Sequence, residues 1–250
     1  MIELQDVVKR YGAFTAVDGV SLDVQPGQIH GFLGPNGAGK TTTIKMIAGL
    51  LKPTSGRIVV NGHDTASSPE GAKASLGFIP DRPFVYEKLT AGEFLGFHAG
   101  LYGLDGAPVA ARAKEMLEMF ELSKWEGELI ESFSHGMKQR LVMAAAFMHR
   151  PKAVLVDEPM VGLDPRGARL IKDVFRRMSE HGVAILMSTH TLEVAQEMCD
   201  RISIILKGKI IAHGTVDELR ALADSPGEQL TPVFLKLTGG SALQEIDEIV

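Results

Sequence analysis

The chain has 250 residues, of which 45% are hydrophobic and 23% charged, a composition typical of a globular protein with a substantial core. Its formal net charge of −5 gives no support for a general role in nucleic-acid binding, and its single cysteine, Cys199, excludes an internal disulfide. No apolar run reaches the roughly 18–20 residues that span a bilayer, so a role at a membrane requires another chain. The charged, alternating amino-terminal segment does not predict a secretory signal.

The first part of the chain predicts short strands around one glycine-rich loop. The predicted strands cover residues 2–8, 16–24, 29–33 and 57–60. Residues 40–48 are predicted to form a helix that Gly49 ends, and Asn61-Gly62 predicts a turn.

The middle of the chain changes to helical apolar spacing, from about residue 91 to residue 150, after a strand-like segment at 76–80. Strands return at 153–156, 183–187, 202–206 and 210–213, and Lys207-Gly208 predicts a hairpin between the last two. Alternation of strands and helices predicts a largely parallel sheet with helices on both faces. A small strand at 233–237 and a helix at 242–249 are expected after residue 226.

A phosphate-binding loop is the strongest signal. The pattern is Gly34, Pro35, Asn36, Gly37, Ala38, Gly39, Lys40 and Thr41, and every fixed position of the P-loop is filled. Curled backbone amides and the start of the following helix would bind a polyphosphate, Lys40 would add a positive charge, and the Thr41 hydroxyl would ligate Mg²⁺. The alternative is a glycine-rich turn that binds nothing, but the strand before it and the helix after it favour the functional interpretation.

Two acidic residues follow the buried strand at 153–156. Asp157 is predicted to hold the magnesium shell and Glu158 to act as general base on the attacking water. An acidic cap for the next helix is the alternative. His190 ends another strand of the same sheet, where it could reach the γ-phosphate, although a lone histidine is more often structural.

Taken together, these residues resemble the nucleotide-binding subunits of ABC transporters over nearly the whole chain. The similar segments are Gly34–Thr41 (Walker A), Ala153–Glu158 (Walker B), Phe133–Met137 (signature), Gly162–Pro165 (D-loop), His190 (switch histidine) and Tyr11, which matches an adenine-stacking aromatic residue. The resemblance implies catalytic roles for Glu158, His190 and Lys40 and metal ligation by Thr41, Asp157 and Asp81. It implies nucleotide contacts by Tyr11, Gly34, Pro35, Asn36, Gly37, Ala38, Gly39, Lys40, Thr41, Thr42, Ser134, Gly136 and Asp164.

The chain departs from the family's pattern at two places. His135 and Met137 replace a glycine and a glutamine of the signature, a variation that resembles bacterial exporters. Asp81 stands where the family has a glutamine; it could approach Mg²⁺ as an oxygen ligand, or it could be a turn acid beside Arg82.

The implied fold is an α/β P-loop NTPase with a mainly parallel sheet, an N-terminal antiparallel β subdomain and an inserted helical subdomain. Residues 1–225 would form the ATPase domain, with the helical insert at about 91–150, and residues 226–250 a small extension. The resemblance implies ATP and Mg²⁺ as cofactors, a second ATPase subunit with which two ATP molecules are sandwiched, and an integral membrane permease subunit. The location implied is cytoplasmic, peripheral on the inner face of the cell membrane.

Other functions are weaker. A soluble ABC-type ATPase that acts on ribosomes or nucleic acid is the main alternative, but the chain has one cassette, no long coiled coil and an acidic balance, so no nucleic-acid partner is expected. A purely structural nucleotide binder would not need Glu158 after Asp157. The apolar residues Phe84, Val85, Tyr86 and Leu89 either contact the permease or pack against the helical insert.

Overall fold

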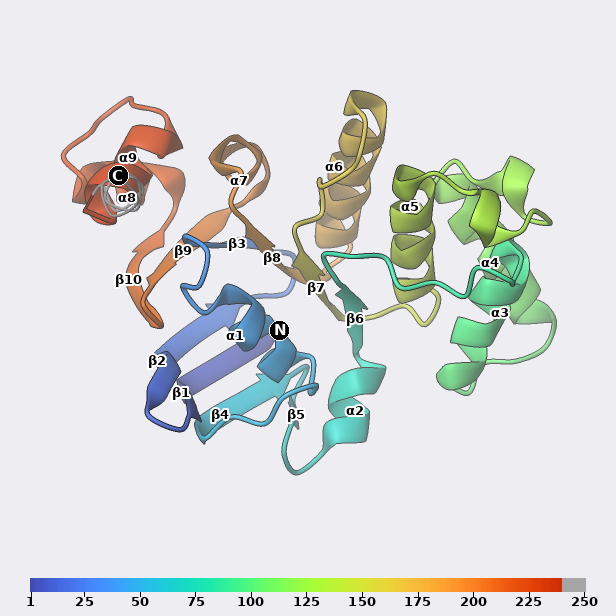
Figure 1. Ribbon diagram of the computed structural model, residues 1–250, viewed down its shortest axis with the longest axis horizontal. Coiled ribbons are helices and arrows are strands. Elements are labelled where there is room, and N and C mark those ends of the chain that lie inside the picture. Colours follow the sequence, from blue (N-terminus) through green and yellow to red (C-terminus); the bar gives the residue numbers. More distant parts are fainter. Residues whose placement is uncertain (240–250) are drawn as a thin grey trace.

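Two β-sheets organise the chain in the computed structural model, which describes residues 1–239 (Figure 1). The smaller sheet is antiparallel. In spatial order its strands are β2 (Phe14–Val24), β1 (Ile2–Tyr11), β4 (Ser55–Val60) and β5 (His63–Asp64).

The larger sheet is parallel except at one edge. In spatial order its strands are β10 (Lys209–Gly214), β9 (Arg201–Leu206), β3 (Ile29–Leu33), β8 (Ala184–Thr189), β7 (Ala153–Asp157) and β6 (Leu76–Ile79). Only the β9–β10 pair is antiparallel. The three central strands β3, β8 and β7 are buried along their whole length, as expected for a parallel sheet covered on both faces.

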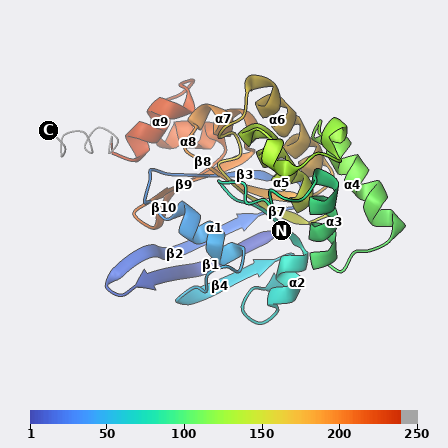
Figure 2. The same cartoon turned by 45° about the vertical axis from the view of Figure 1, so that its right-hand side comes forward.

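Helices lie on both faces of the larger sheet and at the two ends of the molecule (Figure 1, Figure 2). They are α1 (Lys40–Ile47), α2 (Pro69–Ala74), α3 (Ala91–Leu101), α4 (Ala107–Met119), α5 (His135–Ala146), α6 (Pro165–Glu180), α7 (Leu192–Met198), α8 (Val216–Leu222) and α9 (Leu230–Leu237), with short 3₁₀ turns η1 (Ser123–Trp125) and η2 (Ile130–Ser132). Helices α6 and α7 lie over one face, while α1 and the antiparallel sheet lie against the other (Figure 1). In the turned view the helical insert α3–α5 lies at one end of the molecule, and α8 and α9 at the other (Figure 2).

The core follows the alternation of the strands. On β7, Val154 and Val156 join the apolar cluster under the helices, whereas Ala153 and Leu155 join the cluster that faces α1 and the antiparallel sheet. Because side chains alternate across a strand, a fully apolar segment is what a two-sided core requires.

The predicted fold class is confirmed: the sheet is mainly parallel, with an antiparallel β subdomain and an inserted set of helices. The hairpin at Lys207-Gly208 is also confirmed. One prediction is wrong, because residues 233–237 form the end of helix α9 and not a strand. Leu230 and Val233 are buried at helical spacing where α9 packs on α7 and α8.

The predicted helix at 242–249 lies outside the described residues. Within residues 1–239, no helix combines the length and the hydropathy that crossing a membrane requires.

Candidate functional site

The glycine-rich loop crosses the carboxyl edge of the larger sheet. Strand β3 ends at Leu33 and α1 begins at Lys40, so residues 34–39 form the connection. Gly37 and Gly39 have φ angles of +75° and +111°, which favour glycine. No side chain caps α1, so the amide N–H groups of its first turn are available to an anion at the positive end of the helix.

Lys40 folds back over this loop. Its Nζ donates to the carbonyl oxygens of Gly34 at 2.6 Å and Pro35 at 3.0 Å, and the residue is buried. Burial lowers the pKa of Lys40, an effect that the nearby carboxylates of Glu158 and Asp157 oppose. Among residues 1–239, the only direct partners of this buried cation are carbonyl oxygens, which suits a negatively charged ligand at this position.

Two of the loop glycines touch the backbone of distant strands. A Cβ on Gly34 would lie 2.3 Å from the carbonyl oxygen of Ile205, and a Cβ on Gly39 would lie 2.6 Å from that of Ala16. Both contacts exclude any side chain. The glycines therefore allow the loop to curl, and they allow its backbone to pack closely on β9 and β2.

The turn of the β9–β10 hairpin also holds the loop. The amide of Gly208 donates to the carbonyl of Ala38 at 2.9 Å, and the carbonyl of Gly208 accepts from the amide of Asp18 at 2.9 Å. The sequence prediction identified the hairpin but not this support, since nothing in the local pattern relates residue 208 to residue 38.

Asp157 ends β7 beside the loop. It accepts hydrogen bonds from the hydroxyls of Ser188 and, at 3.4 Å, Thr41. Burial raises the pKa of Asp157, and the negative charges of Asp81 and Glu158 add to this effect. A hydroxyl and a carboxylate converge here as hard oxygen donors, the set that Mg²⁺ prefers.

Glu158 follows with a left-handed backbone, φ +52°, which turns its side chain away from the strand direction. Its carboxylate accepts from the Thr189 hydroxyl at 3.2 Å and pairs with His190 Nδ1 at 2.8 Å, and its amide donates to the Ser188 carbonyl at 3.0 Å. The ends of β7 and β8 thus position the predicted base and the predicted histidine together. The sequence prediction missed Ser188 and Thr189, whose place at the end of an apolar strand was the only available signal.

Asp81 lies at the same edge of the sheet. It lines a pocket of about 640 Å³ together with Glu158, His135 and Lys138. Within residues 1–239 it makes no ion pair with Arg82 or any other residue, and its charge contributes to the raised pKa of Asp157. This position is compatible with the predicted metal-side role.

The signature segment begins α5. The Ser134 hydroxyl accepts from the amide of Met137 at 3.3 Å as an N-cap. The His135 ring packs on Gly162, where a Cβ would lie 2.2 Å from His135 Cδ2. Gly136 lies against the carbonyl oxygen of Gly162. The predicted signature and D-loop are therefore in direct contact.

Four predicted binding residues lie apart from the loop. Asp164 caps α6 by accepting from the Gly167 amide at 2.7 Å, and the ring of Tyr11 is half-exposed at the end of β1. Across the described part of the chain, no hydrogen bond joins Tyr11, Ser134, Gly136 or Asp164 to residues 34–41. Their predicted contacts with a nucleotide remain predictions.

The support from Gly208 gives a first prediction. Gly208→Ala should weaken ATP binding about tenfold while leaving the catalytic rate constant at saturation nearly unchanged, because its Cβ would meet the Ala16 carbonyl at 2.9 Å and shift the turn away from Ala38. Binding of a fluorescent ATP analogue and the separation of KM from kcat measure the effect. Gly62→Ala is the matched control, since its φ of +81° matches the +80° of Gly208 and its Cβ would meet nothing within 4 Å. Equal losses in both variants would show that backbone strain alone is responsible.

The environment of Asp157 gives a second prediction. Its pKa is higher in the folded chain than in the unfolded chain, so ionisation destabilises the fold above the raised pKa, and this penalty fades as the pH falls. Asp157→Asn should therefore raise the urea midpoint of the ligand-free protein at about pH 7.5, and raise it less at about pH 4.5. Asp105→Asn, at an exposed position, is the control. A gain that does not depend on pH would contradict the assignment.

Comparison with known proteins identifies the family. The model of the ABC transporter family matches residues 17–161. The linearmycin resistance ATP-binding protein LnrL of Bacillus subtilis is 40% identical over 88% of this chain and 70% of LnrL. The probable multidrug ABC transporter ATP-binding protein YbhF of Escherichia coli is 38% identical over 95% of this chain, which spans only 41% of YbhF.

Solved structures agree. A structure described as the ATP binding subunit of an ABC transporter matches 95% of this chain and 99% of its own, with a TM-score of 0.90 and 35% identity. A dimeric, post-hydrolysis structure of the ATP-binding cassette MJ0796 bound to ADP and Pi matches 86% of this chain and 98% of its own, with a TM-score of 0.78 and 26% identity. The chain therefore belongs to the ABC transporter family, among its ATP-binding proteins.

Proposed function

We propose that this chain hydrolyses Mg-ATP and that the hydrolysis drives an ABC transporter. The observation that carries the proposal is the position of Glu158. Its carboxylate is held by Thr189 and His190, next to Asp157 and close enough to Lys40 for the charges to interact. A fixed carboxylate beside a phosphate-binding loop is what activation of water for phosphoryl transfer requires.

The donor set fits Mg²⁺. The Thr41 hydroxyl and the Asp157 carboxylate lie 3.4 Å apart. Burial and the charges of Asp81 and Glu158 raise the pKa of Asp157, and a bound cation would oppose both effects. When bound, Mg²⁺ would neutralise charge on the phosphate oxygens. Asp81 supplies a further oxygen at the same edge, directly or through water.

The remaining steps belong to the protein's own groups. The loop amides and Lys40 would bind the phosphates, with Lys40 exchanging the carbonyls of Gly34 and Pro35 for phosphate oxygens. Glu158 would accept a proton from the attacking water. Burial of Lys40 excludes competing solvent and strengthens its attraction to the ligand.

His190 cannot serve Glu158 and a phosphate at once in its neutral form. A neutral imidazole carries one proton, and the Nδ1 that donates to Glu158 must hold it. Nε2 can then donate to a phosphate oxygen only if the ring is protonated or turns away from Glu158. In the conformation described here, a neutral His190 therefore orients Glu158 and does not donate to a phosphate.

A second subunit would complete the site. Ser134 and Gly136 have no side-chain hydrogen bond to residues 34–41 of their own chain, yet Ser134 opens a helix whose amino-terminal end suits an anion. We propose that they bind the γ-phosphate of ATP on the partner subunit in a head-to-tail dimer. The dimeric, ADP- and Pi-bound structure of MJ0796 supports this arrangement.

The apolar loop after Asp81 divides into two kinds of residue. Val85 and Leu89 pack on the core, whereas Phe84 and Tyr86 are 78% and 59% exposed. The Tyr86 ring meets Phe97 of α3 edge-on at 5.3 Å. Such an exposed patch suits a protein partner, and we propose that an integral membrane permease docks here, one short loop away from Asp81.

The names of the relatives support an exporter role for the proposed transporter. The names of LnrL and YbhF refer to drug resistance and multidrug transport, which supports an exporter bound to the cytoplasmic face of the cell membrane. They give no support for a ribosomal or nucleic-acid role. The membrane subunit would choose the substrate.

Glu158→Gln tests the hydrolysis step. The amide cannot accept the proton, so steady-state ATPase activity should fall at least about a hundredfold while ATP binding is kept. Glu180→Gln, at an exposed position at the end of α6, is the control. Wild-type turnover in Glu158→Gln would contradict the assignment of the base.

The docking patch gives a prediction about the partner. Phe84→Ala/Tyr86→Ala should lower co-purification with the co-expressed membrane permease by about tenfold, with ATP binding unchanged. Leu50→Ala/Leu222→Ala, two leucines that are each 62% exposed, is the matched control. Undiminished recovery of the permease with the first variant would exclude this surface.

A further inference from the structure

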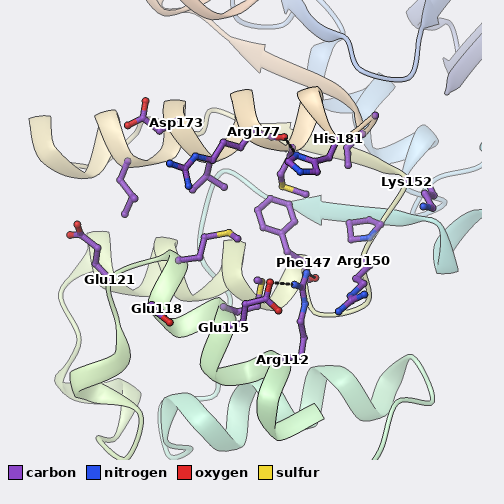
Figure 3. A pocket seen from close by; sticks show the side chains of 18 residues that line it. Arg112, Glu115, Glu118, Glu121, Phe147, Arg150, Lys152, Asp173, Arg177 and His181 are labelled. Atoms are coloured by element: carbon purple, nitrogen blue, oxygen red, sulfur yellow. Dashed lines mark hydrogen bonds and ion pairs between the residues drawn. The ribbon is translucent and has the colours of Figure 1, made fainter. Parts of the chain in front are cut away.

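A groove of about 840 Å³ lies between the helical insert and the α/β core (Figure 3). Helix α4 and the end of α5 form one wall, and α6 forms the other. Lys152 and Val183 line it and directly precede β7 and β8. It therefore opens at the amino ends of strands whose carboxyl ends carry Asp157 and Thr189, so it is separate from the phosphate site.

The interior of the groove is apolar. Phe147 projects into its centre in Figure 3, and Met116, Leu170 and Met178 also line it. Methionine side chains adapt to the shape of what they contact. A volume of this size is usual for a small-molecule site.

One end of the groove is basic. Arg150 and Lys152 are exposed there, and neither has an ion pair among residues 1–239. Arg112 donates to the Phe147 carbonyl at 2.8 Å and pairs with Glu115 at 2.8 Å, but its Nε is buried and has no acceptor in the described structure. A buried donor without an acceptor is costly, so this end would gain from an anionic acceptor.

The opposite end is acidic. Asp173, Glu118 and Glu121 lie towards that end, with Arg177 near Asp173 (Figure 3). Glu121 already pairs with Arg166. The two ends therefore differ in net charge: Asp173, Glu118 and Glu121 outnumber Arg177 at one end, whereas Arg112, Arg150 and Lys152 outnumber Glu115 at the other.

We propose that this groove binds a water-soluble amphiphile with one carboxylate and a short alkyl chain. The carboxylate lies between Arg150 and Lys152, at the end of the groove that Arg112 also lines, and the alkyl chain lies over Phe147 and the methionines. Charge complementarity sets the orientation, because the reversed pose would place the carboxylate against Asp173 and Glu118. The apolar interior excludes a small hydrophilic anion as the ligand.

Occupancy would link two parts of the molecule. The groove joins α4 of the insert to α6 of the core. Helix α6 begins at Pro165, three residues after Gly162, the D-loop glycine that contacts His135. A ligand in the groove therefore restrains the insert relative to the core without touching the nucleotide site.

Decanoate is the probe, titrated into the full chain by isothermal calorimetry, with decyltrimethylammonium as the cationic counterpart of the same length. We expect saturable one-to-one binding of decanoate and at least about tenfold weaker binding of the cation. Arg150→Ala/Lys152→Ala should weaken decanoate binding about tenfold. Lys114→Ala/Lys124→Ala is the matched control, since both lysines are exposed on the insert and neither lines the groove.

A second variant tests the apolar part. Leu170→Trp fills the groove from α6, so it should abolish decanoate binding while far-UV circular dichroism and the ATP affinity stay unchanged. Equal affinity for the two probes, or decanoate binding that survives both groove variants, overturns the proposal. Loss of binding in the Lys114→Ala/Lys124→Ala control also overturns it, because overall charge would then be the cause.

Discussion

The approach of the P-loop backbone to two distant strands is the constraint on which the rest of the site depends. Gly34 lies against the Ile205 carbonyl and Gly39 against the Ala16 carbonyl, both at distances that no Cβ could occupy. The Gly208 amide also holds the Ala38 carbonyl, and Lys40 holds the carbonyls of Gly34 and Pro35. The amides at the start of α1, which no side chain of the described residues caps, remain for an anion. The position of Lys40 follows, since it is fixed at the start of α1.

The parallel sheet then gathers the chemical groups. Strands β3, β7 and β8 run side by side and end at the same edge, so Lys40, Asp157 and His190 meet although far apart in the sequence. The opposite edge carries the groove. Helix α6 runs from the first edge to the second, which gives the two sites one shared rigid element.

Much of this arrangement is readable from the sequence. The P-loop, the acid pair and the histidine each follow an apolar strand, and local patterns suffice to find them. The residues that hold these groups in place cannot be found in this way. Gly208, Ser188 and Thr189 act through tertiary contacts that local patterns do not encode. The mistaken strand at 233–237 has the same cause, because its apolar residues fit either period until packing on α7 and α8 selects the helix.

The hairpin support also sets an order of events during synthesis. The P-loop leaves the ribosome early. Ile205, on which Gly34 packs, and Gly208, which binds the Ala38 carbonyl, are translated late, after strands β3, β6, β7 and β8 of the larger sheet. Until then, residues 34–39 have the Ala16 carbonyl of β2 beside them but lack the contacts with Ile205 and Gly208. We therefore expect a nascent chain to complete its nucleotide site only after the edge strands β9 and β10 have been made.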